Sequence, residues 1–221
     1  RGAILDGRGR VLAASNQFRT IFAEPRAIQE PRDTANQLAK ALDLPAHEIC
    51  KTIMESRNPG YIPIKVGASA GECEVVRPLH GIGIQGSFVF GYDWDTPETF
   101  DQVCEFTEKT RLDSAFFTIL TPFPGTRVYE RLEREGRILT TAWERYDMSH
   151  AVFRPRCMSP EQLEERYHDL NRRFFSVLSL LRRLPLSRRA QVFGPMNWAF
   201  RRGWKRAART GARLPKSDRA L

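Results

Sequence analysis

Two aspartates stand where an α/β protein would bind a ligand. Asp93 and Asp95 follow an apolar and aromatic stretch, 83–91, that is typical of a buried strand. Ligands of α/β sheets lie beyond the carboxyl ends of the strands, so these carboxylates could hold a hydroxyl group or a metal ion. A structural role explains the same positions, with Asp95 capping the next helix and Asp93 bracing the turn, and we favour that interpretation.

No other side chains are spaced for catalysis or metal binding. The histidines lack the i, i+4 spacing of a helical metal site, and no serine sits in a nucleophile elbow. The string Gly81-Ile82-Gly83-Ile84-Gln85-Gly86 spells a dinucleotide-binding pattern, but it lies within or before a strand rather than after one. The cysteines are too widely separated for a zinc knuckle, a thiol redox motif or an iron–sulfur loop. The sequence thus predicts no catalytic residue and no metal ligand, and each cysteine is expected to be a small buried residue or a free thiol: Cys50, Cys73, Cys104 and Cys157.

Positive charge gathers at the C-terminal end of the chain. The net charge is +9 over 221 residues, yet residues 171–221 hold 14 Lys and Arg against one acid, Asp218. An aromatic and basic helix is expected at 196–209, and its surface suits an anionic membrane or an acidic partner, with nucleic acid less favoured. Two plainer alternatives stay open: a solvated, partly disordered end, or aromatics that pack on the domain. The residues predicted to contact an anionic surface are Arg201, Arg202, Trp204, Lys205 and Arg206.

The elements that would position these residues indicate a mixed α/β fold. Alternating strand and helix between residues 83 and 135 predict part of a parallel α/β sheet, followed by a long helix from Ser159 to Leu184. The small, flexible composition of Gly67–Gly71 suggests a boundary. We expect a small α+β module at 1–66, a junction at 67–73, barrel strands and helices at 74–156, a helical extension at 157–209 and a disordered basic tail at 210–221.

Residues 1–66 resemble the N-terminal, non-catalytic module of class B penicillin-binding proteins. The resemblance rests on Arg1-Gly2-Ala3-Ile4-Leu5-Asp6-Gly7-Arg8-Gly9-Arg10-Val11-Leu12-Ala13 and on Phe22-Ala23-Glu24-Pro25. It implies a periplasmic pedestal that would contact proteins of cell-wall synthesis. The serine transpeptidase motifs are absent from the sequence, so this resemblance implies an interaction module rather than an enzyme.

Residues 74–200 are similar to the C-terminal part of cobalamin-binding radical S-adenosylmethionine enzymes. The similarity is carried by Gly86-Ser87-Phe88-Val89-Phe90-Gly91-Tyr92-Asp93, by Leu120-Thr121-Pro122-Phe123-Pro124-Gly125-Thr126 and by Gly136-Arg137-Ile138-Leu139, with smaller matches at Trp143, Phe153-Arg154-Pro155 and Met158. It implies the last strands of a partial α/β barrel with a helical tail. By position, the resemblance assigns one wall of the adenosine site to Gly86, Phe88, Gly91, Leu120, Thr121 and Pro122.

This second resemblance implies S-adenosylmethionine, a [4Fe-4S] cluster and cobalamin as cofactors. The sequence lacks the cluster loop C-x-x-x-C-x-x-C and the cobalamin domain, so the missing domains would be partners of this chain. We therefore expect a piece of a cytoplasmic radical enzyme that is not competent alone and whose substrate is lipid-like or tetrapyrrole-like. The competing hypothesis is the cell-wall binding module. Because the two resemblances imply opposite sides of a membrane, a chimeric reading frame and a genuine fusion both stay open, as does an unstable fragment.

Overall fold

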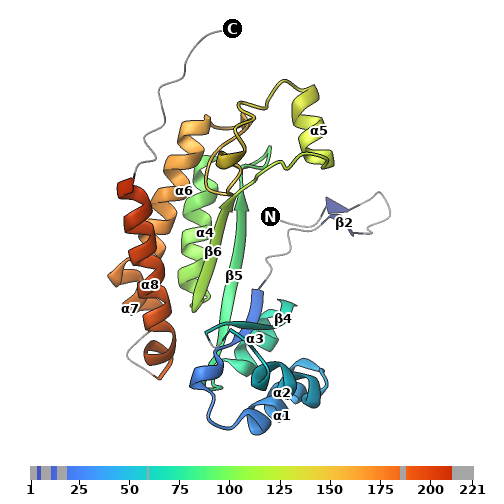
Figure 1. Cartoon of the computed structure of the whole chain (residues 1–221), viewed down its shortest axis with the longest axis vertical. Coiled ribbons are helices and arrows are strands. Elements are labelled where there is room, and N and C mark those ends of the chain that lie inside the picture. The colour runs from blue at the N-terminus through green and yellow to red at the C-terminus, as the bar shows by residue number, and fades with distance from the viewer. Residues whose placement is uncertain (1–3, 6–10, 14–18, 59, 185–187, 211–221) are drawn as a thin grey trace. The chain divides into compact units, whose positions relative to one another are not determined.

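The computed structural model describes residues 4–5, 11–13, 19–58, 60–184 and 188–210 (Figure 1). The expected basic tail lies outside these residues except for Thr210. The elements are β1 (Ile4–Leu5), β2 (Val11–Ala13), β3 (Arg19–Ala23), α1 (Pro31–Leu42), α2 (Ala46–Met54), β4 (Ile62–Ala68), α3 (Ala70–Val76), β5 (Ile82–Phe90), α4 (Pro97–Lys109), β6 (Ser114–Ile119), α5 (Arg127–Arg134), α6 (Pro160–Phe174), α7 (Val177–Arg183) and α8 (Arg188–Thr210), with short 3-10 turns at Pro25–Ala27 and Trp143–Arg145.

A mixed four-stranded sheet organises the chain, which confirms the expected α/β class. Its strand order is β4-β3-β5-β6, and β3 is antiparallel to both of its neighbours. Strands β5 and β6 point the same way and are connected through α4, as in a βαβ unit (Figure 1). The parallel part of the sheet is therefore confined, in the described residues, to β5 and β6.

Strand β3 comes from the stretch expected to be a separate N-terminal module, yet it pairs directly with β5. Ile21 lies opposite Ile84, and Ala23 lies opposite Ile82. Residues 67–73, whose composition indicates a flexible junction, have regular structure instead. Gly67 belongs to β4, and Ser69 caps α3 by accepting a hydrogen bond from the N–H of Glu72.

The chain divides into two compact units. The first comprises residues 1–88 and 114–116, and the second comprises residues 89–113 and 117–221. In the first unit, α1 and α2 pack against each other, and the buried side chains include Phe22, Leu38, Leu42, Ile53 and Ile84.

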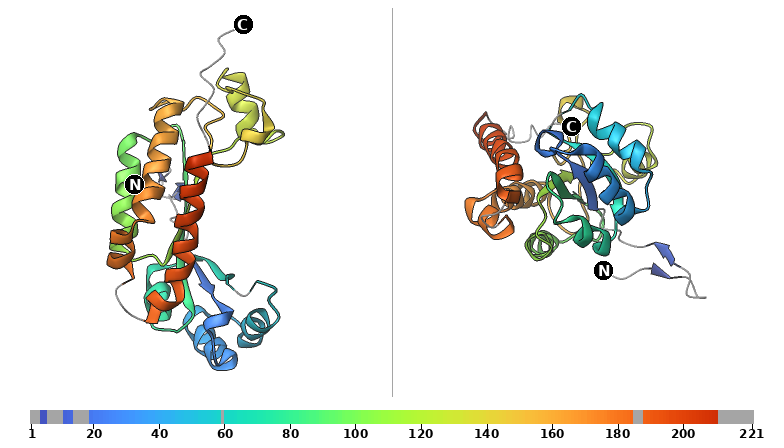
Figure 2. Two further views of the ribbon diagram at one scale, coloured as in Figure 1. Left: turned by 60° about the vertical axis from the view of Figure 1, so that its left-hand side comes forward. Right: turned by 90° about the horizontal axis from the view of Figure 1, so that it is seen from below.

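The second unit is built around α4 and α6, which lie side by side (Figure 2). The ring of Phe90 at the end of β5 stacks on Phe100 of α4 with 4.2 Å between centroids. Phe117 of β6 meets Phe174 of α6 edge to face at 5.3 Å. These fully or almost fully buried rings fix the end of β5, from which the turn at 91–95 begins.

The long helix expected from Ser159 to Leu184 is two helices. It begins as predicted, with a capping box between Ser159 and Gln162, but α6 ends at Phe174. The hydroxyl of Ser176 then accepts a hydrogen bond from the N–H of Ser179 and starts α7. The apolar periodicity continues through both helices, so the break is visible only in the capping serine. The last helix also differs from the expected span 196–209, because it begins at Arg188 and contains Pro195.

Candidate functional site: an arginine-bound turn at the end of β5

The turn after β5 is held by Asp95, which is 5% exposed. Its Oδ2 atom accepts hydrogen bonds from the backbone N–H groups of Gly91 at 2.9 Å and Tyr92 at 3.0 Å. The favoured interpretation of Asp95 as a helix cap is wrong, because Thr96 occupies the N-cap position of α4. The N–H of Thr96 donates to the hydroxyl of Thr99 at 3.1 Å. Asp95 instead fixes the direction in which the chain leaves the sheet.

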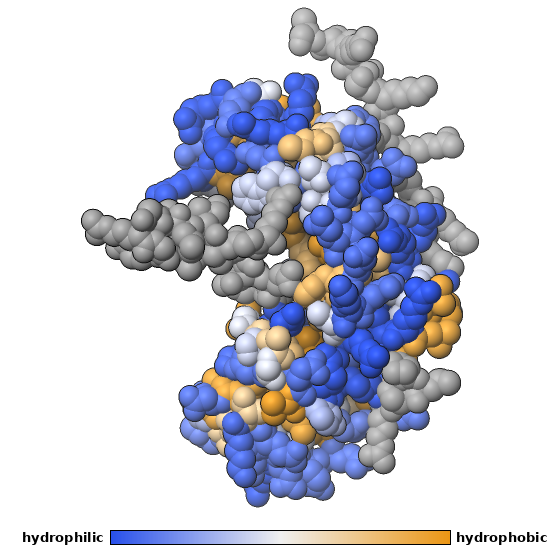
Figure 3. Space-filling view, turned by 180° about the vertical axis from the view of Figure 1, so that it is seen from behind, coloured by the Kyte–Doolittle hydropathy of each residue, from blue (hydrophilic) through white to orange (hydrophobic). Residues whose placement is uncertain are grey.

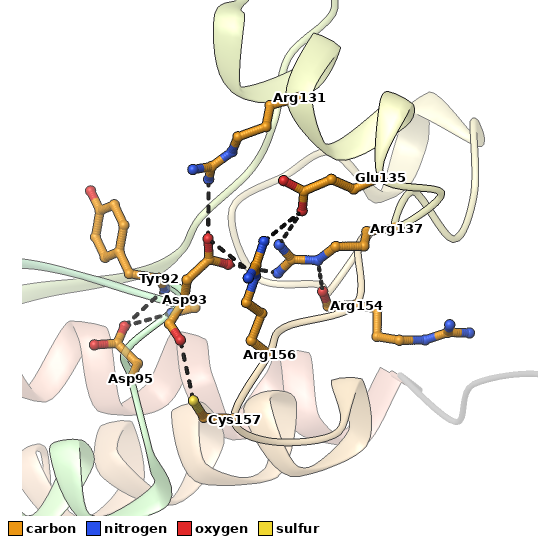
Figure 4. A network of polar contacts seen from close by, with 10 residues as sticks. Tyr92, Asp93, Asp95, Arg131, Glu135, Arg137, Arg154, Arg156 and Cys157 are labelled. Carbon is orange, nitrogen blue, oxygen red and sulfur yellow. Dashed lines mark hydrogen bonds and ion pairs between the residues drawn. The ribbon is translucent and has the colours of Figure 1, made fainter.

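Asp93 is the centre of a network of arginines (Figure 4). The guanidinium of Arg137 donates to its carboxylate at 2.8 Å, and guanidinium nitrogens of Arg131 and Arg156 lie 3.5 and 3.6 Å away. Glu135 joins the network by accepting from Arg137 at 2.8 Å and from Arg156 at 3.2 Å. Three arginines thus face two carboxylates, which leaves an excess of one positive charge. Asp93 is therefore bound by arginines, rather than being a free carboxylate or a simple turn brace.

Arg137 is placed by the backbone on both sides of it. Gly136, with a positive φ of 62°, ends α5, and the N–H of Arg137 donates to the carbonyl of Leu132 at 2.8 Å. Ile138 then pairs with Phe153 in an isolated antiparallel bridge. In the same pairing, Nε of Arg137 donates to the carbonyl of Arg154 at 2.7 Å. The Nε atom of Arg137 is therefore bound to the backbone, while the two terminal nitrogens of the guanidinium donate to the carboxylates of Glu135 and Asp93.

Charge and burial act in opposite directions within this network. Burial alone would raise the pKa of Asp93, but the hydrogen bond and the charge of Arg137 hold the pKa below its usual range. The hydrogen bond from Arg137 likewise lowers the pKa of Glu135. Burial works to lower the pKa of Arg137, yet its two carboxylate partners raise it overall. Both acids are therefore ionised at neutral pH.

An exposed aromatic pair flanks the network. The rings of Tyr92 and Trp94 stack with centroids 5.1 Å apart and an interplanar angle of 1°. Trp94 is 57% exposed, which is unusual for so large a ring. In a later loop, the ring centroids of Trp143 and Tyr146 lie 4.9 Å apart, and Trp143 is also exposed. The second unit thus presents apolar rings close to positive charge, a combination that suits a planar or apolar ligand with an anionic group.

The residues predicted to wall the adenosine site are distributed over both units. Gly86 and Phe88 belong to the first, whereas Gly91 and the segment Leu120–Pro122 belong to the second. Within the second unit, the N–H of Leu120 donates to the carbonyl of Phe90 at 2.8 Å. This bond brings the turn at Gly91 next to Leu120, Thr121 and Pro122, and Pro122 is buried. No bound ligand tests the predicted wall, and it stays a prediction.

The packing of the protein itself explains why position 91 is glycine. Gly91 has a φ of +104°, which side chains rarely adopt, and a Cβ placed on it would lie 3.1 Å from atoms of Leu163 and Phe153. The glycine therefore does not require a nearby ligand. Its role is to let β5 turn beneath α6 and the loop that carries Phe153.

Replacing Gly91 by alanine is expected to lower the free energy of unfolding by about 2 kcal/mol, because it combines backbone strain with a close contact on two buried side chains. All four tryptophans, at 94, 143, 198 and 204, lie in the second unit, so urea unfolding followed by their fluorescence reports on it. Gly125, whose Cβ would meet nothing within 4 Å but whose φ is +78°, provides a control for strain alone. Equal effects at the two positions would contradict the proposed contact.

The side chains predicted to contact an anionic surface are described only in part. Arg201 is half-buried, with its guanidinium 5.2 Å from the centre of the Trp198 ring, and Arg202 is exposed. The backbone of Trp204, Lys205 and Arg206 continues α8, but their side chains lie outside the described residues.

The described residues do not fit an iron–sulfur cluster. Within that part of the chain, no three His, Cys, Asp or Glu side chains gather as metal ligands, and the four cysteines are free thiols. Burial raises the pKa of Cys73 and of Cys104, which disfavours the thiolate form that a metal needs. The exposed Cys157 donates its S–H to the carbonyl of Asp93 at 3.2 Å. Any cluster would need ligands from elsewhere.

Comparison with known proteins supports one of the two resemblances. Residues 126–203 match a family described as a domain of unknown function (DUF4070). The chain is 32% identical over 121 residues to the bacteriochlorophyllide d C-12(1)-methyltransferase of Chlorobaculum tepidum, which is 55% of this chain and 25% of that protein. It is 36% identical over 74 residues to the C-8(2)-methyltransferase of the same organism, covering 34% of this chain and 16% of the relative.

A third relative is the hopanoid C-2 methylase of Rhodopseudomonas palustris, which is 34% identical over 68 residues, 30% of this chain and 13% of that protein. These relatives transfer methyl groups. The chain thus spans a quarter or less of the length of each of these three relatives. The matches support the similarity to radical S-adenosylmethionine methyltransferases, and nothing in them supports the penicillin-binding resemblance of residues 1–66.

The arginines of the site were not predicted from the sequence. Arg137 lies 44 residues from Asp93, and Arg131 and Arg156 lie on other segments. Their only sequence signal was Gly136-Arg137-Ile138-Leu139, which carries the family resemblance but gives no contact. The family match includes all three arginines but not Asp93, so the network joins the matched region to the turn after β5.

Proposed function

We propose that this chain forms the C-terminal part of a cobalamin-type radical S-adenosylmethionine methyltransferase. The proposal rests on the hydrogen bond that brings Gly91 next to Leu120–Pro122. These segments follow two neighbouring parallel strands, and α/β folds bind ligands at such strand ends. The family resemblance assigns these same segments to the adenosine wall. The matches to three methyl-transferring relatives support the assignment independently of the geometry.

The chain's own residues would position ligands rather than perform chemistry. Asp95 fixes the turn through two backbone hydrogen bonds, and Arg137 locks Asp93 in place. Tyr92 and Trp94 would offer an apolar face to the substrate. The relatives act on bacteriochlorophyllide d and on hopanoids, so this surface fits a tetrapyrrole-like or lipid-like substrate. S-adenosylmethionine, the cluster and cobalamin would be held mainly by other domains, which would supply the radical and the methyl group.

The proposal predicts that the chain by itself cannot cleave S-adenosylmethionine. The purified chain would be reconstituted anaerobically with iron and sulfide, and cluster absorbance and cleavage products would be measured. We expect neither, because the described part of the chain brings no three thiolates together. A variant with Cys157 replaced by serine should behave identically. Cleavage by the unmodified chain would contradict this division of labour between the chain and its missing domains.

A further inference from the structure

Helix α7 exposes a cluster of large apolar side chains. Val177, Leu178 and Leu181 are 45%, 58% and 55% exposed, and they lie at i, i+1 and i+4 on one side of the helix. The other side is used for packing, since Ser179 and Arg183 are buried. Figure 3 shows apolar side chains gathered at the edge of the molecule where α7 lies. The cluster is therefore an additional surface and not part of the core.

Helix α8 presents an aromatic side chain with positive charge next to it. Trp198 is 49% exposed, whereas Phe193 and Asn197, on the packed side of the helix, are buried. The guanidinium of Arg201 lies over the Trp198 ring, and Arg202 is exposed. Tryptophan has an apolar body and a polar N–H, which suits the boundary between water and lipid.

Neither α7 nor α8 contains an acidic residue, although Glu108 lies near Arg182 and Asp113 binds Arg189 of α8. The sequence contains no Asp or Glu from residue 170 to residue 217. Arg182, next to the apolar cluster, is 60% exposed, and its contact with Glu108 of α4 is long, at 3.8 Å. Two copies of such a surface would repel each other, so a second copy of this chain is a poor occupant. A partner surface that is anionic outside and apolar beneath would match both the positive charge and the exposed apolar side chains of α7 and α8.

We propose that the exposed faces of α7 and α8 dock on an anionic lipid bilayer. We define this lipid-docking surface as Val177, Leu178, Leu181 and Trp198 with Arg182 and Arg202. The apolar side chains would enter the boundary between headgroups and acyl chains, and the arginines would pair with lipid phosphates. None of the helices in the described part of the chain has both the length and the hydropathy of a membrane span. The proposal is independent of the methyltransferase assignment, because it uses a different surface of the second unit.

Vesicle sedimentation tests the proposal with the complete chain. Vesicles of phosphatidylglycerol and phosphatidylcholine in equal parts should bind the chain, and vesicles of phosphatidylcholine alone should bind it weakly. The double substitution of Leu178→Glu and Leu181→Glu should lower the partition coefficient at least about tenfold. Arg182→Gln and Arg202→Gln should each lower it by about fivefold, and raised salt should reduce binding by the unmodified chain.

Matched controls lie in the first unit. Val75 of α3 is 61% exposed and Arg32 of α1 is also exposed, so Val75→Glu and Arg32→Gln should leave vesicle binding unchanged. Circular dichroism would verify that each variant is folded, because all four tryptophans lie in the second unit and their fluorescence does not report on the control positions. The proposal is overturned by equal binding to both kinds of vesicle, by no binding to either, or by equal losses in test and control variants. It is also overturned if the α7 substitutions instead abolish a concentration-dependent dimer measured without lipid.

Discussion

Replacing Arg137 by methionine is expected to lower the free energy of unfolding of the second unit by about 3 kcal/mol, because Arg137 holds the arginine network together. Arg137 is 8% exposed, and its guanidinium binds Asp93, Glu135 and the carbonyl of Arg154. Methionine fills much of the same space but leaves Asp93 and a carbonyl without their strongest donor. Arg131 and Arg156 would still balance the two carboxylates, so the main source of the expected loss is the three partly buried hydrogen bonds that Arg137 alone donates.

Urea unfolding followed by tryptophan fluorescence measures this loss. Arg154→Met is the matched control, because only the backbone of Arg154 binds Arg137 and the side chain of Arg154 points away from the network (Figure 4). That variant should unfold like the unmodified protein. If both variants lose the same amount, the effect would come from the surrounding loop and not from the ion pairs.

Acid should remove the effect of Arg137. The pKa of Asp93 is depressed in the folded state, so its contribution is present above the unfolded pKa of about 3.9 and is lost as pH falls through the folded value. The difference between the unmodified protein and Arg137→Met should therefore shrink as the solution is acidified below about pH 4. A difference that stays constant with pH would indicate lost packing in place of lost charge.

Replacing Arg183 by methionine is the second substitution with a large expected effect. It should also lower the free energy of unfolding of the second unit by about 3 kcal/mol. Arg183 is 2% exposed, and its guanidinium donates to the carbonyls of Leu112 at 2.5 Å and Phe174 at 2.9 Å. It also lies 3.5 Å above the Phe174 ring. Burial lowers its pKa to about 10, so it remains charged at neutral pH. Methionine would leave two buried carbonyl groups without these donors, and each such group costs about 1–3 kcal/mol.

The neighbouring arginine provides the control for this prediction. Arg182 is 60% exposed and makes only a long contact with Glu108, so Arg182→Met should leave the urea midpoint nearly unchanged. If Arg183→Met unfolded at the same urea concentration as Arg182→Met, the carbonyl bonds of Arg183 would not stabilise the unit. The two variants share the same residue types and differ only in burial.

Local signals in the sequence were sufficient where the structure depends on neighbours along the chain. The Ser159 capping box and the glycine stop at Gly136 follow from residues within one turn, and both are present. The end of α6 was missed although Ser176 carries a capping signal, because the apolar period runs through it. Local patterns therefore predict that a helix or strand is present better than they predict where it ends.

Contacts between distant residues were not readable from one sequence. Nothing near Arg19–Ala23 indicates that this strand pairs with β5, which begins at Ile82. Likewise, the residues next to Asp93 in the sequence give no sign that Arg131, Arg137 and Arg156 bind its carboxylate. Such pairings depend on the tertiary fold, and a single sequence contains only the residue types that make them possible.

A domain exchange tests most directly whether the region from the turn after β5 to α8 completes a methyltransferase. Residues 89–210 of this chain would replace the matching segment of the Chlorobaculum tepidum C-12(1)-methyltransferase, and methyl transfer to its substrate would be measured under anaerobic conditions. We predict measurable methyl transfer by the exchange protein. A folded exchange protein that retains its cofactors but transfers no methyl group would contradict the proposed function.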